Sequence, residues 1–284
     1  MIDIHNHILP NIDDGSKSFE ESINILKQAY ESGVTDIKVT PHFILGSSYS
    51  SKVKDNETIL KELKSKLKLE NININLYLGN EIFVENNMLE LLKNKSVTSL
   101  NKSRYVLFEL PMNNNFKGLK DLLFNLQVNG YIPVIAHPER YRFIKGNPEE
   151  VINLRQAGAL FQINIGSILG NYGDEARKTV MLLLKHQIPS FIATDTHHDT
   201  HEFYKKIIVT LQVRLPENMT ARSGKRVSFS ASAGMTVEAA LEAADRCAGK
   251  GVSVEIMKLA TVAPLDFDAV AASVRKTGRI VVAE

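Results

Sequence analysis

The sequence is poor in cysteine and contains no long apolar run. Cys247 is the only cysteine among 284 residues, which excludes an internal disulfide framework and a zinc site built from several thiolates, and is typical of a reducing compartment. No segment approaches the roughly 18 apolar residues that a membrane span requires. The opening MIDIHNHILP carries an acid and two histidines where a signal peptide has a basic start and an apolar core. We therefore expect a cytoplasmic protein without a membrane span.

An excess of basic charge is also missing. Lysine and arginine number 34 against 32 aspartates and glutamates, which gives a formal net charge of +2. Binding to nucleic acid or to an anionic membrane usually leaves a basic stripe, whereas the charges here alternate in sign along most of the chain. Neither a Walker-type loop nor a G-x-G-x-x-G loop is present. We expect no nucleic-acid partner.

Composition changes abruptly along the chain. Asparagine occurs 21 times in residues 1–206 and once afterwards, whereas alanine occurs 6 times before residue 207 and 14 times from there on. All eight histidines precede residue 202. This change indicates two segments of different origin that meet near residues 205–222. The chain is therefore divided into a first segment (residues 1–206), a connector (207–224) and a second segment (225–284).

The first segment alternates short β-rich runs with amphipathic stretches, which predicts a parallel sheet covered by helices. Strands are expected at Ile2–His5, Asp36–Thr40, Asn73–Gly79, Tyr105–Leu110, Ile132–Ala136, Leu160–Ile165 and Ser190–Thr194. A first helix is expected between a capping box, Ser18 with Glu21, and the stop residue Gly33. Further helices are expected near residues 55–68, 117–129, 148–157 and 174–187. This alternation favours a (β/α) barrel of about seven units over an open sheet.

The second segment has the pattern β-α-β-α-β. Strands are expected at Arg226–Ala231, Val252–Leu259 and Arg279–Ala283, with helices at Thr236–Gly249 and Asp266–Thr277. Three parallel strands in roughly 60 residues leave sheet edges exposed, as in a part of a larger doubly wound domain. The predicted fold class is therefore α/β: a (β/α)7-like barrel followed by a partial doubly wound segment.

Polar side chains follow six of the predicted strands of the first segment, at the point where each strand ends. Because the carboxyl ends of barrel strands face one mouth, five histidines and four carboxylates are expected to converge there. The candidate metal ligands are His5, His7, Asp14, His42, Glu81, Glu109, His137, Asp195 and His197.

This donor set predicts a metal site. Nine donors exceed what one ion uses, so two or three divalent ions with a bridging carboxylate or water are expected. His5 and His7 are two residues apart in an extended run, which places both rings on one face of the strand, and Asp195 and His197 repeat that spacing. Imidazole and carboxylate donors without thiolate suit manganese, iron, cobalt or zinc alike.

Arg140 is the candidate catalytic residue. A guanidinium beside a metal cluster matches phosphate oxygens and stabilises the charge on a transferring phosphoryl group. The alternative for Arg140 is a surface ion pair with Glu139 or with the neighbouring Glu149 and Glu150.

The motifs HxH, TPH, GNEI, FELP, AHPER and DTHH resemble the polymerase and histidinol phosphatase (PHP) superfamily. The stretches MIDIHNHILPNIDDG, IAHPERY and FQINIGSILG are more similar to one branch, the bacterial manganese-dependent protein-tyrosine phosphatases of the CpsB/YwqE type from capsule and exopolysaccharide operons. The resemblance covers residues 1–206. It implies a PHP barrel, manganese, the same nine ligands with Arg140 on the phosphate, and hydrolysis of phosphotyrosine on a partner tyrosine kinase by metal-activated water.

The chain departs from this branch after the DTHH motif. Members usually carry a second arginine there, whereas this sequence offers Lys205 and Lys206. The stretch that begins AGMTVEAALEAADRC resembles the C-terminal domain of transketolase-like enzymes, particularly the β subunit of 2-oxo acid dehydrogenase E1. That domain supports subunit assembly in its family, so we expect a partial copy without thiamine chemistry.

Three functions remain open at this stage. The first is hydrolysis of protein phosphotyrosine, with a bacterial tyrosine kinase as the partner. The second is hydrolysis of a small phosphomonoester such as histidinol phosphate. The third is a non-catalytic binding or oligomerisation module with a vestigial metal site. A homo-oligomer is compatible with each of them, through the second segment.

Overall fold

The computed structural model describes residues 1–204 and three further strands at residues 227–232, 254–259 and 280–283. The packing of the chain divides it into two units. One contains Asp3–Ser32 and Asp36–Ile207, and the other contains Met1–Ile2, Gly33–Thr35 and Ile208–Glu284.

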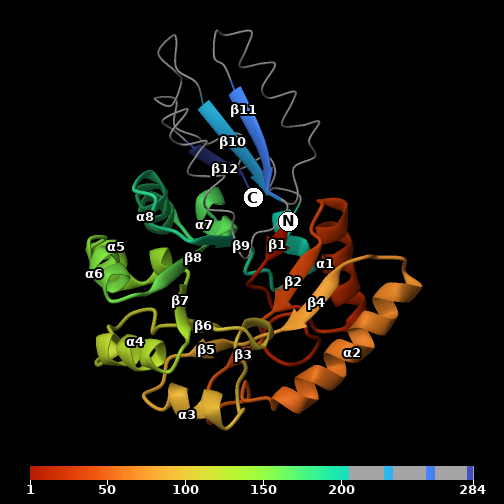
Figure 1. Ribbon diagram of the computed structural model, residues 1–284. Coiled ribbons are helices and arrows are strands. Elements are labelled where there is room, and N and C mark those ends of the chain that lie inside the picture. Colours follow the sequence, from red (N-terminus) through yellow and green to blue (C-terminus); the bar gives the residue numbers. More distant parts are fainter. Residues whose placement is uncertain (205–226, 233–253, 260–279, 284) are drawn as a thin grey trace. The chain divides into compact units, whose positions relative to one another are not determined.

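Residues 1–204 alternate short strands with helices (Figure 1). The strands are β1 (Ile2–Asp3), β2 (Asp36–Val39), β3 (His42–Phe43), β4 (Asn75–Leu78), β5 (Glu81–Phe83), β6 (Tyr105–Glu109), β7 (Ile132–Ala136), β8 (Leu160–Asn164) and β9 (Phe191–Ala193). The α-helices are α1 (Phe19–Glu31), α2 (Val53–Leu69), α3 (Met88–Lys93), α4 (Leu119–Val128), α5 (Arg142–Gly146), α6 (Glu150–Gln156), α7 (Ile165–Leu169) and α8 (Asp174–Lys185). Three short 3-10 helices are η1 (Leu100–Lys102), η2 (Pro138–Arg140) and η3 (Asp199–His201).

All seven strands expected in the first segment are present, with bounds within two residues of the prediction. The short strands β3 and β5 were not predicted. Each follows the preceding strand after two residues, Thr40–Pro41 in one case and Gly79–Asn80 in the other. Pro41 has no amide hydrogen to contribute to a ladder, which explains the first interruption.

The parallel strands form two sheets, in the orders β1-β2-β4 and β3-β5-β6-β7-β8-β9. Beyond the ends of β1 and β9, Asn6 and Thr196 form an isolated parallel bridge. The amide of Asp195 donates to the carbonyl of His5 at 2.9 Å in the same region. The chain segments that follow β1 and β9 therefore lie side by side, although their strands are far apart in the sequence.

Helix α1 begins as the sequence predicts. The Ser18 hydroxyl accepts a hydrogen bond from the amide of Glu21 at 3.1 Å, and the Glu21 carboxylate accepts one from the amide of Lys17 at 2.7 Å. On its buried face, Ile25 and Leu26 are at most 1% exposed. Burial of such a side chain contributes about 1.5–3 kcal/mol, so this face holds the helix against the strands.

The second unit contains a parallel sheet in the order β11-β10-β12, built from β10 (Val227–Ser232), β11 (Val254–Leu259) and β12 (Ile280–Ala283). The three strands expected in the second segment are thereby confirmed. The expected helices at residues 236–249 and 266–277, the connector, and Lys205 and Lys206 lie outside the described residues.

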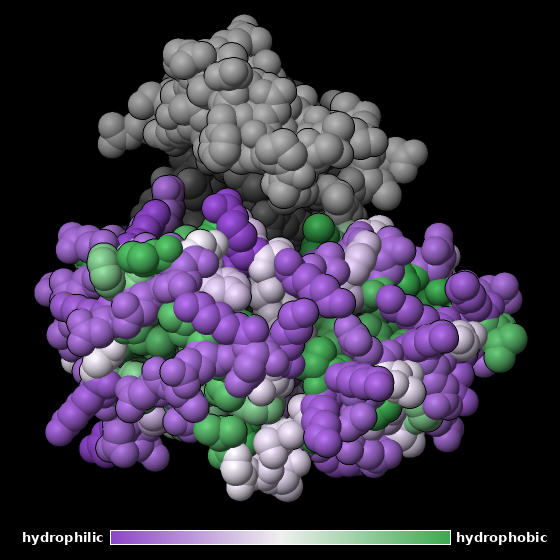
Figure 2. Space-filling view, turned by 60° about the horizontal axis from the view of Figure 1, so that its bottom comes forward, coloured by the Kyte–Doolittle hydropathy of each residue, from purple (hydrophilic) through white to green (hydrophobic). Residues whose placement is uncertain are grey.

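Hydrophilic side chains cover most of the face of the first unit seen in Figure 2, with smaller apolar areas between them. Phe124 and Val128 of α4 are 65% and 67% exposed. Among the described residues, no helix combines the length and the apolar character needed to cross a membrane.

Candidate metal centre

The nine predicted ligands lie together at the carboxyl ends of the strands. Eight of them form three groups in which the donor atoms lie within 4.8 Å of one another. The groups are His7, Asp14, His42 and His197; His5, His7, Glu81 and Asp195; and His42, Glu81 and Glu109. His137 joins them through its Nε2 atom, 3.0 Å from Oε1 of Glu81. Strand ends that are distant in the sequence thus supply one continuous donor cluster.

Glu81 lies at the centre of this cluster and is fully buried. Its Oε2 atom is 3.1 Å from Nε2 of His5, 3.3 Å from Nε2 of His7 and 3.0 Å from Nδ1 of His42. None of these approaches has hydrogen-bond geometry, so Oε2 is a buried oxygen without a hydrogen-bond partner in the described structure. Burial raises the pKa of Glu81, but the surrounding histidines outweigh it and hold this pKa well below its usual range.

The outer nitrogens of His5 and His7 are already engaged. Nδ1 of His5 lies 2.7 Å from Oε1 of Gln162, whose own amide nitrogen donates to Asn164, and Nδ1 of His7 lies 2.8 Å from the Asp13 carboxylate. Both acceptors are oxygens, so both rings donate from Nδ1, and each neutral ring has its lone pair on Nε2. These two Nε2 atoms face each other at 3.3 Å. A proton or a cation must separate two such lone pairs, and this fixed arrangement of imidazole rings is typical of metal ligands.

Asp14 and His197 mark the exposed edge of the cluster. His197 donates from Nδ1 to the carbonyl of Asp195 at 3.0 Å, and its Nε2 lies 3.7 Å from Oδ1 of Asp14. The side chain of Asp14 is 52% exposed, whereas those of the deeper donors are nearly inaccessible. Burial, together with the positive charge of His7, lowers the pKa of His197 to about 4. His197 is therefore neutral at physiological pH, which is the form that binds a metal.

The deeper histidines have the opposite protonation behaviour in the metal-free protein. Burial lowers the pKa of His5, but the charges of Glu81 and Asp195 outweigh it and raise this pKa to about 9. Burial raises the pKa of Asp195, but the charge of His5 outweighs burial and holds this pKa below its usual range. The cluster thus holds protons that divalent ions would displace on binding, and its donor set fits such ions.

The backbone is strained at two of the donors. His137 has φ +32° and Asp195 has φ +52°, in the left-handed region that residues other than glycine rarely adopt. Such conformations cluster at functional sites and persist because the surrounding structure holds them. A close approach adds to this constraint, because a Cβ atom on Gly15 would lie 2.1 Å from the carbonyl oxygen of His7.

Arg140 lies beside the cluster and is partly exposed. Its Nη1 atom donates to Oδ2 of Asp195 at 3.1 Å, and its guanidinium lies over the ring of Tyr172 at 4.3 Å. Glu139, one of the alternative partners expected for Arg140, is instead fully buried and accepts the amide hydrogen of Asn164 at 2.9 Å. The guanidinium is thereby positioned at the donor cluster rather than in a surface ion pair.

Three residues of the site were not predicted: Asp13, Gln162 and Tyr172. Gln162 lies two residues before Asn164 on β8, so strand periodicity places both on one face and could have indicated it. Asp13 is part of the Asp-Asp-Gly sequence in which only Asp14 was selected. Tyr172 lies between α7 and α8, and no sequence signal pointed to its place beside Arg140.

Parallel strands that carry imidazole and carboxylate donors at their carboxyl ends define a metal-dependent α/β enzyme. Comparison with known families specifies this class further. The family described as "Capsular polysaccharide synthesis, CpsB/CapC" matches residues 1–208, and the transketolase C-terminal domain matches residues 219–284. The chain therefore belongs to the CpsB/CapC family, and the two resemblances seen in the sequence are confirmed.

Individual relatives agree with this assignment. The putative tyrosine-protein phosphatase CapC of Staphylococcus aureus is 42% identical over 201 residues, which cover 71% of this chain and 78% of that protein. Tyrosine-protein phosphatase YwqE of Bacillus subtilis is 35% identical over 198 residues, 70% of this chain and 78% of that protein. A crystal structure from a study of YwqE of Bacillus subtilis and CpsB of Streptococcus pneumoniae, described as metal-dependent tyrosine phosphatases, matches with a TM-score of 0.69 and 27% identity, covering 89% of this chain and 96% of that one.

The second segment has a relative of another kind. The β subunit of acetoin:2,6-dichlorophenolindophenol oxidoreductase of Cupriavidus necator is 48% identical over 63 residues. These residues are 22% of this chain and 18% of that protein. The similarity is thus confined to one domain of the relative and carries none of its activity to this chain.

Proposed function

We propose that the chain is a metal-dependent phosphomonoesterase that hydrolyses phosphotyrosine on proteins and acts in capsule or exopolysaccharide synthesis. One observation carries the proposal: imidazole and carboxylate donors from six strand ends converge on the buried carboxylate of Glu81, with the guanidinium of Arg140 at the edge of the cluster. The names of the relatives support the substrate class.

We also propose that the strands of the first segment close into a (β/α)7-like barrel. β3 follows β2 along the chain, and β5 follows β4. Because β2 pairs with β4 and β3 pairs with β5, both in parallel, the two sheets can be treated as one continuous sheet. The bridge between Asn6 and Thr196 then joins the two ends of the combined sheet. In this proposal the barrel spans residues 1–206, a connector spans 207–224, and residues 225–284 form a partial transketolase-like segment.

The cluster is proposed to hold two or three divalent ions, manganese in the first place and iron, cobalt or zinc as alternatives. The three donor groups overlap pairwise in His7, His42 and Glu81. Because Nδ1 of His7 is engaged by Asp13, His7 would offer one nitrogen, whereas Glu81 would offer its two carboxylate oxygens. The proposed ligands are His5, His7, Asp14, His42, Glu81, Glu109, His137, Asp195 and His197.

Divalent ions held by these ligands would supply an acidified water and would neutralise phosphate charge. The protein contributes the remaining steps. Arg140, oriented by Asp195 and Tyr172, presents its free N–H groups to phosphate oxygens and stabilises the charge that they carry during transfer. The leaving phenolate has a conjugate acid of pKa near 10, so it departs readily. A thiol nucleophile is not required, and Cys247 has no role in this scheme.

The experiment that tests the substrate class compares two substrates on the full chain. We expect a phosphotyrosine peptide to be hydrolysed with a much higher kcat/KM than histidinol phosphate. A large preference for histidinol phosphate would instead establish the small-molecule alternative. Absence of any metal-dependent turnover of either substrate, in a folded protein, would establish the non-catalytic alternative.

The proposed partner is a bacterial tyrosine kinase whose phosphotyrosines are the substrate, and the proposed location is the cytoplasm. The second segment is proposed to serve oligomerisation or docking, because its similarity to a transketolase-type domain leaves out the chemistry of those enzymes. Gel filtration coupled to light scattering on the full chain tests the homo-oligomer.

A further inference from the structure

A basic pocket lies between the loop that follows β3 and the start of α2, and one of its lining residues, Phe43, directly follows the candidate ligand His42. Its volume is 530 Å³. It is lined by Phe43, Leu45, Gly46, Ser50, Ser51, Lys52, Val53, Lys54, Asn94, Lys95 and Ser96. Three of these residues are lysines and none is acidic, so the lining has a charge of about +3 at neutral pH.

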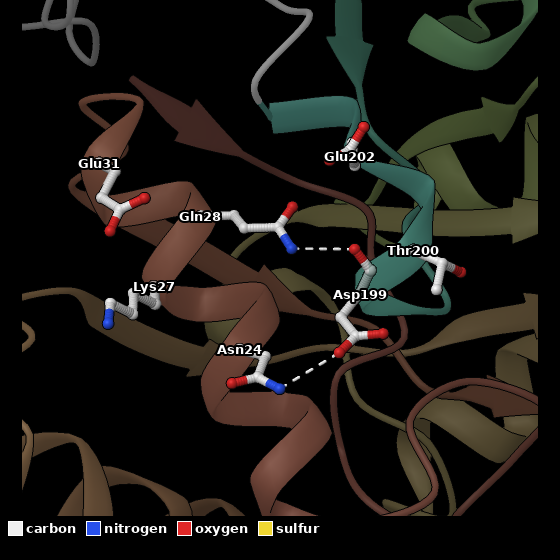
Figure 3. A pocket seen from close by; sticks show the side chains of 7 residues that line it. All are labelled: Asn24, Lys27, Gln28, Glu31, Asp199, Thr200 and Glu202. Carbon is white, nitrogen blue, oxygen red and sulfur yellow. Dashed lines mark hydrogen bonds between the residues drawn. The ribbon is translucent and has the colours of Figure 1, made fainter.

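Two other pockets of the described structure lack this excess. The pocket in Figure 3 lies between α1 and η3, where Lys27 faces a lining that includes Glu31, Asp199 and Glu202. A further pocket combines two lysines with Asp121 and with Glu150 of α6. In the first of these pockets three acidic side chains outnumber one lysine, and in the second the charges balance. Among these three pockets of the described residues, the basic pocket alone carries uncompensated positive charge.

The lysines of the basic pocket have no ion-pair partner among the described residues. The closest acid along α2 that forms an ion pair, Glu57, is engaged by Lys102 at 3.1 Å, and Asp55 does not line the pocket. No side chain caps the start of α2, and Val53 and Lys54 of its first turn line the pocket. Lysine side chains and free helix amides attract negative groups together.

The loop of residues 44–52 connects this pocket with the donor cluster. The ring of Tyr49 is stacked on that of His42, with centroids 6.1 Å apart and planes at 13°. Leu45, Ser50 and Lys52 of the same loop line the pocket. Leu45 is 45% exposed and offers apolar contact to a bound chain. A polypeptide whose phosphotyrosine occupies the cluster can thus place neighbouring residues in the pocket.

We infer that the basic pocket binds a carboxylate-rich segment of the substrate polypeptide, adjacent to the phosphotyrosine, and thereby selects acidic phosphotyrosine sequences. The inference rests on the proposed phosphatase function. The proposed ligands are aspartate and glutamate side chains. An arginine fork suits one group that accepts two hydrogen bonds, whereas three separate lysine charges suit several carboxylates spread along a chain.

The test uses two phosphotyrosine peptides that differ only in having Asp and Glu, or Asn and Gln, on both sides of the phosphotyrosine. We expect the full-length, metal-loaded protein at low salt to show roughly a tenfold higher kcat/KM for the acidic peptide. The difference should lie in KM, because each of three exposed ion pairs adds a modest amount of binding free energy. Raising the salt to about 0.5 M is expected to remove most of the preference by screening.

The triple variant Lys52→Ser, Lys54→Ser and Lys95→Ser is expected to reduce the preference to near unity through KM, with kcat for the amide peptide retained. The matched control, Lys61→Ser, Lys64→Ser and Lys68→Ser, removes the same charge from exposed positions of α2 and is expected to keep the full preference. Equal preference in the pocket variant and the wild type, or equal loss in both triple variants, would overturn the inference.

The same preparations separate this inference from the proposed function. p-Nitrophenyl phosphate has no flanking residues, so its metal-dependent turnover by the wild type reports on the donor cluster alone. Turnover of this substrate without discrimination between the peptides would reject the basic pocket as a specificity site and leave the phosphatase function intact. Absence of metal-dependent turnover of all three substrates would reject the phosphatase function itself.

Discussion

Oδ2 of Asp13 lies 2.8 Å from Nδ1 of His7 and also accepts the backbone amide hydrogen of His42 at 2.8 Å. One buried carboxylate therefore orients a predicted ligand through its ring and the neighbouring ligand through its backbone. His7 and His42 in turn approach Glu81 from two directions. Because Asp13 fixes the proton of His7 on Nδ1, it leaves Nε2 available for a metal ion, as outer-sphere carboxylates do in other metal sites.

The first prediction concerns this carboxylate. Asp13→Asn keeps one oxygen and the size of the side chain but weakens its hold on the His7 tautomer, so metal affinity is expected to fall by about 10–100-fold. Competition with a chromophoric chelator measures this affinity. Asp121→Asn on the surface of α4 is the control and is expected to leave affinity unchanged. If Asp13→Asn leaves the metal affinity unchanged, Asp13 acts only through its hydrogen bond with the backbone amide of His42.

A second prediction separates metal binding from catalysis. His42→Ala removes a donor shared by two of the three groups and is expected to lower metal content. Arg140→Ala removes the guanidinium beside the cluster and is expected to retain the metal but lower kcat by about 10²–10³-fold. Metal analysis of each variant, paired with turnover, checks both outcomes. The reverse pattern, with metal lost in Arg140→Ala and retained in His42→Ala, would refute the assigned roles.

A third prediction concerns the pH dependence of the metal-free protein. The pKa of His5 is raised to about 9 from an ordinary value of 6.5, because Glu81 and Asp195 outweigh burial. A raised pKa stabilises the folded state fully below pH 6.5, and this contribution, on the order of 3 kcal/mol, is lost as the pH rises through 9. The lowered pKa values of Glu81 and Asp195 have the opposite effect, because the stability that these carboxylates contribute is lost as the pH falls into the acid range.

Urea unfolding of the metal-free protein at a series of pH values measures this dependence. The free energy of unfolding is expected to fall between pH 6.5 and 9, whereas the metal-loaded protein is expected to fall less, because ions replace the proton of His5. Metal affinity should rise over the same range for the same reason. A metal-free protein of constant stability from pH 6.5 to 9 would contradict the proton-sharing cluster.

A fourth prediction tests the close approach at the site. Gly15→Ala would place a Cβ atom 2.1 Å from the carbonyl oxygen of His7, so the backbone must shift, at a cost of about 1–3 kcal/mol in stability. Metal affinity is expected to fall together with stability, because the shift of the backbone displaces His7. Gly146→Ala is the control, because its Cβ atom would meet nothing within 4 Å among the described residues apart from its chain neighbours and the backbone of its own helix. Thermal unfolding of both variants, with and without metal, distinguishes them.

The strands of the first segment, and the convergence of the candidate ligands, could be predicted from the sequence because both depend on local patterns. Strands alternate with helices over the whole first segment, and most candidate ligands lie at or within a few residues of a strand end, so the parallel arrangement brings them together. Asp14 is the exception, because it lies in the loop well beyond β1. His5 and His7 illustrate this, since their spacing of two residues places both rings on one face. The expected helices at α1, α2, α4, α6 and α8 were recovered for the same reason.

What the sequence did not predict depends on contacts between distant segments. Gln162 supports His5 across the cluster, and Tyr172 supports Arg140 from a loop. Gly166 lies buried in α7, where a Cβ atom would meet Tyr172 at 2.7 Å. The short helices α3, α5 and α7 span only five or six residues each, too few for a periodic pattern.

The most direct test of the account is the hydrolysis of a phosphotyrosine peptide by the full chain, measured together with bound metal, before chelation, after it, and after manganese is restored. The account predicts two or three divalent ions per chain, loss of turnover when they are removed, and recovery on addition of manganese. A folded protein with no bound metal whose turnover is insensitive to chelation would contradict it.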